Sequence, residues 1–208
     1  MGATIQKVVT AGNMDPKGPA NHENNVWIVG DDREVIVIDP AHDVDAVLEA
    51  VAGREVRAVI CTHGHWDHTR IVPEFAARVH APVFLNEQDL FLWTEVTGLE
   101  DGFAPLTPSS EFQIAGVTLK AVATPGHTPG STSLRADDLG VVFSGDSLFP
   151  GGPGATRWDY SSFDAAINSI RTELFTLPEF TTVHPGHGDS TTVGAEAPHL
   201  DEWIARGW

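Results

Sequence analysis

Short apolar runs alternate along the chain with stretches in which apolar residues recur at helical spacing. Runs rich in Val and Ile predict β-strands at residues 4–10, 24–30, 33–39, 57–62, 81–86, 111–124, 131–136, 141–145 and 181–188. Stretches with helical spacing predict helices at residues 43–53, 69–79, 86–96, 161–177 and 196–207. The pattern therefore predicts a protein in which strands and helices interleave.

Turn residues join most of the neighbouring strands as hairpins. Asp31-Asp32 separates the second and third strands, Gly116 divides 111–124 into two strands, and residues 137–140 join the next pair. Hairpins favour a mixed sheet, or two sheets, with helices outside, and hence the α+β class. The Gly/Pro-rich segment 150–156 lies between a strand and a helix, so we expect a mobile loop there rather than a linker between domains.

Composition is that of an ordinary globular protein. Of the 208 residues, 41% are hydrophobic and 20% are charged. No apolar run reaches the ~18 residues of a membrane-spanning helix. The 29 acidic and 12 basic residues give a net charge of −17, and no run of Lys or Arg offsets it. Such a chain repels phosphate backbones, so we expect neither nucleic acid nor a membrane among its partners.

Two features favour a cytoplasmic location. The first residues lack the apolar core of a signal peptide. Cys61 is the single cysteine, so the chain cannot form an internal disulfide bond, and its place on an apolar strand predicts a core residue. We therefore expect a cytoplasmic protein whose partner is a small-molecule substrate.

The segment THGHWDH (62–68) follows the apolar strand predicted at 57–62 and concentrates possible metal ligands. Alternate residues of an extended segment point the same way, so His63 and His65 can converge on one point while Asp67 and His68 turn toward a second. Imidazole and carboxylate groups are ligands of zinc, iron and manganese. The spacing therefore predicts a metal site at the end of this strand.

Three further candidates share one local pattern. His127 in TPGHTPGS, Asp146 in FSGDSLF and His187 in VHPGHGD each lie at the end of a strand-like run beside glycine. Glycine allows the sharp turns that bring a side chain close to a site. These three residues are the additional ligands that two metal ions would need.

The order H-x-H-x-D-H, PGHT, GD and PGH over residues 63–187 resembles the metallo-β-lactamase superfamily, and within it the glyoxalase II-like hydrolases. The resemblance implies an αββα sandwich, in which two mixed β-sheets are flanked by helices and the metals lie at one edge. It assigns two divalent ions, zinc foremost, with iron and manganese as the other choices. The implied ligands are His63, His65 and His127 for the first ion, Asp67, His68 and His187 for the second, and Asp146 as a bridge.

The same resemblance implies a reaction. A water or hydroxide held by the ions would attack a small acyl thioester of a cellular thiol, and the catalytic residue Asp67 would orient that nucleophile. Glyoxalase II carries a C-terminal helical domain, whereas only residues 188–208 follow His187 here. We therefore expect a single domain over 1–208 without that addition, and a thiol other than glutathione becomes reasonable.

Two alternatives lie within the superfamily and one outside catalysis. Persulfide (sulfur) dioxygenases carry the same motifs and hold one iron with the equivalents of His63, His127 and Asp146. Lactone hydrolases use the same metals on an ester. A metal-binding domain without activity is the third, because a fold does not fix a function.

Candidate substrate-binding residues lie around the metal motifs. Trp66 lies within the first motif and can form a pocket wall, and the guanidinium of Arg157 suits a substrate carboxylate. Further candidates for the pocket lining are Trp93, Trp158 and Tyr160. The histidines outside the ligand motifs are interpreted as surface or supporting residues, with His184 as a possible orienting group for a ligand; they are His22, His42, His80, His184 and His199.

Overall fold

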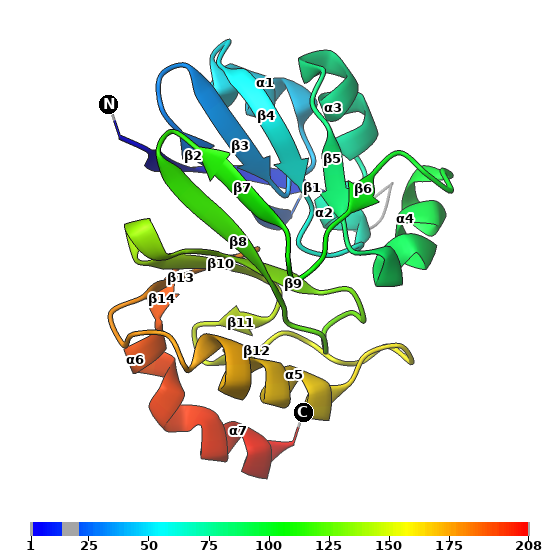
Figure 1. Cartoon of the computed structure of the whole chain (residues 1–208). Coiled ribbons are helices and arrows are strands. Elements are labelled where there is room, and N and C mark those ends of the chain that lie inside the picture. Colours follow the sequence, from blue (N-terminus) through cyan, green and yellow to red (C-terminus); the bar gives the residue numbers. More distant parts are fainter. Residues whose placement is uncertain (1, 14–20, 208) are drawn as a thin grey trace.

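The computed structural model describes residues 2–13 and 21–207 and contains two six-stranded sheets packed face to face (Figure 1). The first sheet has the order β1-β2-β3-β4-β5-β6 and the second the order β14-β13-β10-β9-β8-β7. Strands of the first sheet are Thr4–Gly12 (β1), His22–Gly30 (β2), Glu34–Ile38 (β3), Glu55–Ile60 (β4), Val83–Leu85 (β5) and Ala104–Pro105 (β6). Strands of the second are Glu111–Ile114 (β7), Val117–Ala123 (β8), Thr132–Ala136 (β9), Val141–Gly145 (β10), Thr182–Pro185 (β13) and Thr191–Thr192 (β14).

Both sheets are mixed, as the hairpin pattern predicts. In the first sheet, β1, β2 and β3 pair antiparallel, and β3 to β6 pair parallel. In the second, β7 to β10 pair antiparallel, whereas β10 and β13 are parallel. Helices cover the two outer faces (Figure 1). They are Val44–Val51 (α1), Trp66–Thr69 (α2), Val72–Val79 (α3), Leu90–Thr97 (α4), Phe163–Ser169 (α5), Val193–Glu196 (α6) and Leu200–Arg206 (α7).

Strand β3 shows how the sequence builds the layers. Its residues alternate between two cores: Val35 and Val37 pack toward the helices on the outer face, and Ile36 and Ile38 pack toward the second sheet. Each is at most 1% exposed, and burying a side chain of this size contributes about 1.5–3 kcal/mol. A third core joins the second sheet to α5 and α7. The αββα sandwich expected from the resemblance is confirmed.

Several helices are shorter than their apolar periodicity predicts. The helix expected at 69–79 begins at Val72 (α3), because Pro73 has no N–H to donate and so cannot extend the helix back to Thr69, the last residue of α2. The helix expected at 161–177 begins after Ser162, whose Oγ accepts the amide of Ala165 (3.2 Å), and continues from α5 into a π-helical turn. Pro198 likewise accompanies the break between α6 and α7.

The segment 150–156 is more ordered than the predicted loop. Gly152–Pro153 (β12) pairs antiparallel with Leu148–Phe149 (β11), which follows directly on the predicted GD motif. Gly152 is buried. The pairing of β11 and β12 at this segment was not predicted, because a two-residue strand leaves no periodicity to detect.

The carboxyl ends of β3, β4, β10 and β13 meet at one edge of the sandwich. Two hydrogen bonds tie the sheets together there, from the Asn25 amide to Gly186 O (2.7 Å) and from Trp27 Nε1 to Pro185 O (3.1 Å). Residues that follow these strands are therefore held close together.

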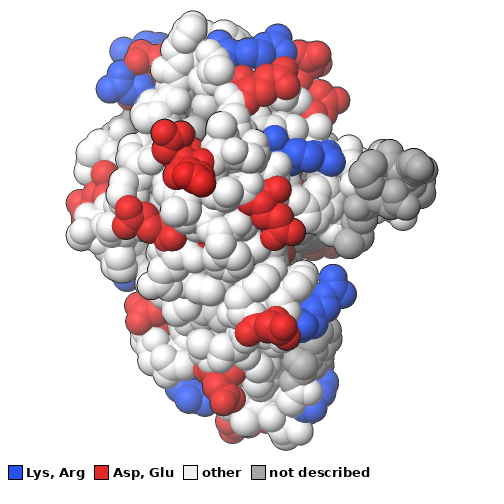
Figure 2. Space-filling view, turned by 90° about the vertical axis from the view of Figure 1, so that its right-hand side faces the viewer, with Lys and Arg blue, Asp and Glu red and all other residues white. Residues whose placement is uncertain are grey.

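Surface charge and helix length relate to the expectation that neither nucleic acid nor a membrane is a partner. On the described part of the face drawn in Figure 2, Lys and Arg side chains lie as separate groups beside Asp and Glu rather than as a continuous basic strip. Within the described residues, no helix combines the length and apolar character needed to cross a bilayer.

Candidate metal centre

Each predicted ligand lies just beyond a strand that ends at this edge. His63 and His65 follow β4, His127 follows β8, Asp146 follows β10, and His187 follows β13. Asp67 and His68 belong to α2, whose first turn begins after His65. The structure brings the seven predicted residues together, although they come from four separate segments of the chain.

The first group consists of three buried imidazoles. His65 Nδ1 lies 3.1 Å from His63 Nε2 and 2.9 Å from His127 Nε2. Ring nitrogens of this group lie within 4.8 Å of one another. One proton on His65 cannot satisfy both neighbours, so the arrangement suits a cation that accepts three lone pairs.

Hydrogen bonds at the outer nitrogens determine the tautomers of these rings. His127 Nδ1–H donates to Ala155 O (2.7 Å), and His65 Nε2–H donates to the Tyr160 hydroxyl (3.0 Å). His63 Nδ1–H donates to Thr62 Oγ1 (3.0 Å), which itself donates to a carboxylate oxygen of Asp39 (2.7 Å). Each ring therefore presents a bare nitrogen to its neighbours, as metal-binding histidines do.

The second group repeats this pattern with a carboxylate. His187 Nε2 lies 3.3 Å from both Asp67 Oδ2 and His68 Nε2, and the latter two atoms are 3.5 Å apart. The outer nitrogens again donate to oxygen: His68 Nδ1–H to Asp39 Oδ2 (2.9 Å) and His187 Nδ1–H to Glu23 O (2.6 Å). Asp39 thus supports one imidazole of each group.

Asp146 lies between the two groups. Its Oδ2 is 3.5 Å from His127 Nε2 and 3.3 Å from His187 Nε2, and its Oδ1 is 3.5 Å from His68 Nε2. Oδ1 is also a buried oxygen without a hydrogen-bond partner among the described residues. Gly186 makes room for this carboxylate, because a Cβ there would come within 2.3 Å of Oδ1. An unpaired buried oxygen beside bare imidazole nitrogens is a donor that a divalent cation could bind.

Burial and neighbouring charge divide the imidazoles into two classes. Burial lowers the pKa of His63 and His127, and it lowers that of His65 to about 3. Burial also opposes charge on His68 and His187, but there the carboxylates prevail: Asp67 and Asp39 help to raise the pKa of His68 to about 9, and Asp146 helps to raise that of His187 to about 11. Without an ion, the second group therefore holds protons where the metal would bind.

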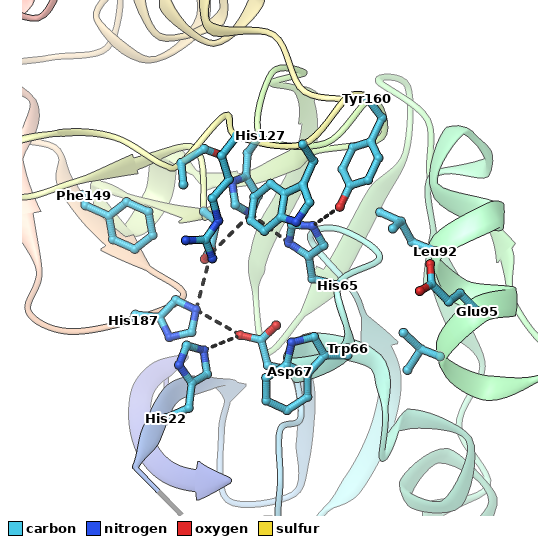
Figure 3. Close-up of a pocket in the computed structure, with 15 residues that line it drawn as sticks. His22, His65, Trp66, Asp67, Leu92, Glu95, His127, Phe149, Tyr160 and His187 are labelled. Atoms are coloured by element: carbon cyan, nitrogen blue, oxygen red, sulfur yellow. Dashed lines mark hydrogen bonds and ion pairs between the residues drawn. The ribbon is translucent and has the colours of Figure 1, made fainter. Parts of the chain in front are cut away.

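A cavity of about 560 Å³ opens onto both groups (Figure 3). Its walls on the metal side include His65, Asp67, His127, Asp146 and His187, together with His22. The other lining residues are largely apolar or aromatic and are Trp66, Leu92, Glu95, Val96, Phe149, Ala155, Arg157, Trp158 and Tyr160. The arrangement can hold a small organic molecule against a pair of Lewis-acidic ions.

Comparison with known proteins agrees with this geometry. The sequence profile of the metallo-beta-lactamase superfamily matches residues 21–190. The chain belongs to the metallo-beta-lactamase superfamily. A similar relative is the hydroxyacylglutathione hydrolase GloC of Haemophilus influenzae, which is 29% identical over 192 residues, or 85% of this chain and 91% of that protein.

Two solved structures are also similar to this member of the superfamily. The BLEG-1 B3 metallo-beta-lactamase has a TM-score of 0.78 at 28% identity and covers 95% of this chain and 98% of its own. TTHA1623, solved in a di-iron-bound form, has a TM-score of 0.75 at 28% identity and covers 90% of this chain and 96% of its own. The similarity extends over nearly the whole superfamily fold.

Most of the substrate candidates named from the sequence of this superfamily member lie at the pocket. Trp66, Arg157, Trp158 and Tyr160 all line it. Trp93 does not: it is fully buried in the core under the first sheet, and its Nε1 donates to Asp101 O (2.9 Å). The helical face of α4 turns Trp93 inward, so its neighbour Leu92 lines the pocket instead.

The structure places two of the remaining histidines, His184 and His22, in different surroundings. His184 is bonded to Ser190 Oγ through Nδ1 (2.8 Å) and stacks near Trp27, so the proposed orienting contact with a ligand is not observed. His22, interpreted as a surface or supporting residue, lies in the pocket with Nε2 2.9 Å from Asp67 Oδ2. Cys61 is buried in the first core, as predicted.

Two carboxylates that organise the site were missed by sequence reasoning. Asp39 accepts hydrogen bonds from Thr62 and His68 and has a left-handed backbone (φ 50°), which few non-glycine residues adopt. An Asp-Pro at the end of a buried strand was the available signal. Asp89 is fully buried and accepts from the amides of Gly64 (2.8 Å) and Gly130 (2.7 Å). It lies within a helix-like pattern, which carries no such signal.

Protonation of the second group predicts a pH dependence of metal binding. A zinc ion needs the bare Nε2 atoms of His68 and His187, and the raised pKa values of about 9 and about 11 mean that protons must leave this pair when the ion binds at pH 7. The apparent affinity of the second site should therefore rise with pH, by about tenfold per pH unit for each proton released. Calorimetry in buffers of different ionisation enthalpy measures this release. Binding at the first group, where burial keeps the imidazoles neutral, should release far fewer protons.

Proposed function

We propose that the protein is a dinuclear metal-dependent hydrolase that cleaves a small acyl thioester of a cellular thiol. The observation that carries the proposal is the pair of adjacent donor groups, joined by Asp146 and opening onto one pocket. In this reaction the oxygen of water bonds to the acyl carbon, the carbon–sulfur bond breaks, and the products are a carboxylate and a thiol. The similarity to GloC supports the choice of a thioester.

Divalent ions, when bound here, would lower the pKa of a water molecule and polarise a carbonyl group. We assign to Asp67 the role of accepting the proton of the attacking water. Its Oδ2 accepts a hydrogen bond from Asn24 Nδ2 (3.1 Å), and its other oxygen points toward His65 in Figure 3. A carboxylate oxygen in this place accepts a hydrogen bond, so it can orient a water and take up its proton.

Tyr160 is suited to bind the substrate. Its hydroxyl oxygen accepts His65 Nε2–H, which leaves the hydroxyl proton free to donate into the pocket. Burial raises the pKa of Tyr160 to about 12, so the hydroxyl keeps this proton at neutral pH. A carbonyl or thioester oxygen is the group that such a donor recognises.

The walls of the pocket favour an apolar acyl group. Leu92 and Val96 of α4 line the cavity of about 560 Å³ together with the aromatic side chains of Trp158 and Tyr160. The two charged lining residues outside the metal groups, Glu95 and Arg157, are exposed. We therefore assign the interior of the pocket to the acyl group, and its exposed mouth to the polar thiol carrier.

Arg157 provides a test of carrier recognition. Its guanidinium lies 4.9 Å from the Trp158 ring, which holds it at the mouth of the pocket. Arg157→Ala should raise KM about fivefold for thioesters whose carrier bears a carboxylate, since exposed charge pairs contribute up to about 1 kcal/mol. Steady-state kinetics with a neutral carrier is the matched control and should show no change. An equal rise of KM for both carriers would contradict this role.

A persulfide dioxygenase is the second candidate. Within the site, His63, His127 and Asp146 form a two-histidine, one-carboxylate set of the kind that binds non-haem iron, with Asp146 Oδ2 3.5 Å from His127 Nε2. The two functions differ in what they consume. Hydrolysis of a panel of acyl thioesters by purified protein supports the first, whereas oxygen uptake with a thiol persulfide, without turnover of any thioester, supports the second.

A further inference from the structure

We propose that His22 is a further ligand of the ion held by Asp67, His68 and His187. His22 is the first residue of β2, and β2 runs antiparallel to β3, so its beginning lies at the edge where the metal groups meet. The imidazole lines the pocket, and its side chain is 29% exposed. The proposal depends on metal binding at this site and not on the nature of the substrate.

The donor atoms are spaced as ligands of one ion would be. His22 Nε2, Asp67 Oδ2 and His187 Nε2 all lie within 4.8 Å of one another. His22 Nε2 is 2.9 Å from Asp67 Oδ2, and His187 Nε2 is 3.3 Å from the same oxygen. Atoms about 2.1 Å from a shared zinc ion lie about 3.0–3.5 Å apart at angles between 90° and tetrahedral. His22 therefore stands in the position of an adjacent ligand.

Hydrogen-bond accounting favours a bond to the ion over a bond to Asp67. Asn24 Oδ1 accepts from His42 Nε2 (2.6 Å), which orients the Asn24 amide so that its Nδ2 donates to Asp67 Oδ2 (3.1 Å). A carboxylate oxygen has two lone pairs. If Asn24 uses one and the ion the other, none remains for an N–H of His22. A bare Nε2 directed at the ion satisfies all of these groups.

The surroundings hold the His22 ring in place. Its centroid is 4.9 Å from that of His187 and 5.6 Å from that of Trp66. The next residue, Glu23, supplies the carbonyl that accepts His187 Nδ1–H (2.6 Å). The beginning of β2 thus positions two imidazoles at the same ion, one through its side chain and one through its backbone.

Ring-nitrogen NMR of the zinc-loaded protein tests this directly. Histidine rings are labelled with ¹⁵N, and each nitrogen is observed through carbon-bound ring protons, which do not exchange with water. The ¹⁵N shift separates zinc-bound, protonated and bare nitrogens. We expect zinc-bound nitrogens from six histidines: the five of the predicted set and His22. A protonated His22 Nε2, with five zinc-bound rings, would overturn the proposal.

Two variants complete the test with zinc itself as the probe. His22→Gln should remove one zinc-bound signal and weaken the second zinc site at least tenfold in competition with a chelator, while the first site is unchanged. His199→Gln is the matched control, because it removes an exposed imidazole whose Nδ1 bonds to Glu202 Oε2 (3.1 Å), and it should retain every zinc-bound signal. Weaker zinc binding in His22→Gln without loss of a zinc-bound signal would assign His22 to support of Asp67 and contradict the proposal.

Discussion

Replacing Asp67 by alanine should lower kcat for thioester hydrolysis by about 10³-fold, within the range of general acid–base groups. Two losses combine in this variant. The oxygen that we assign to the proton of water disappears, and so does a carboxylate that lies 3.3 Å from His187 and 3.5 Å from His68. Turnover is measured at saturating zinc, with the ion content determined in the same sample, so that a slower reaction is separated from a lost ion.

The matched control is Asp159→Ala, which removes an exposed carboxylate from the segment between Arg157 and Tyr160. We expect its kcat to stay within twofold of the unaltered protein. Both variants should unfold cooperatively, because neither Asp67 nor Asp159 belongs to one of the three apolar cores. Unchanged turnover of Asp67→Ala at full ion content would contradict the assigned role.

Asp89→Ala should destabilise the protein by about 3–5 kcal/mol and weaken the first metal site. The carboxylate accepts hydrogen bonds from Gly64 N (2.8 Å), Gly130 N (2.7 Å) and Thr128 Oγ1 (2.6 Å). Each buried donor left without a partner costs about 1–3 kcal/mol. Gly64 lies between His63 and His65, and Thr128 follows His127, so Asp89 joins the two loops that form the first group.

Chemical denaturation of the metal-free protein measures the first effect, and chelator competition measures the second. Asp89→Asn retains one acceptor oxygen and should fall between Asp89→Ala and the unaltered protein. Glu87→Ala, on the same turn, removes an exposed side chain and should change the free energy of unfolding by less than about 0.5 kcal/mol. A loss of stability in Asp89→Ala with an unchanged first site would show that the two loops are not coupled through this residue.

The apolar pattern of the sequence predicted the longer strands and the hairpins. Alternation in β3 and the hairpin at Gly116 gave strands where the structure has them, since one face of each strand meets a core. The strands of two residues, β6, β11, β12 and β14, were missed because two residues carry no periodicity. The helix breaks near Pro73 and Pro198 were also missed, because the apolar spacing continues through each proline.

The candidate site shows the same division. The ligand motifs are compact in sequence, so His63, His65, Asp67 and His68 could be grouped without a structure. His22 and Asp89 lie 45 and 25 residues from the partners that give them a role, Asp67 and Gly64. Only the antiparallel pairing of β2 with β3 and the packing of the segment around α4 bring them to the site. Trp93 was wrongly predicted to line the pocket, because neighbouring residues of a helix point in different directions. In α4, Leu92 faces the pocket and Trp93 faces the core.

Titration of metal-free protein with zinc, with thioester turnover measured at each addition, tests the dinuclear hydrolase most directly. We predict that turnover rises to its maximum at two ions per chain and that elemental analysis of the freshly purified protein gives the same number. A single tightly held iron per chain, with oxygen uptake in the presence of a thiol persulfide and no thioester cleavage at any ion content, would contradict the account.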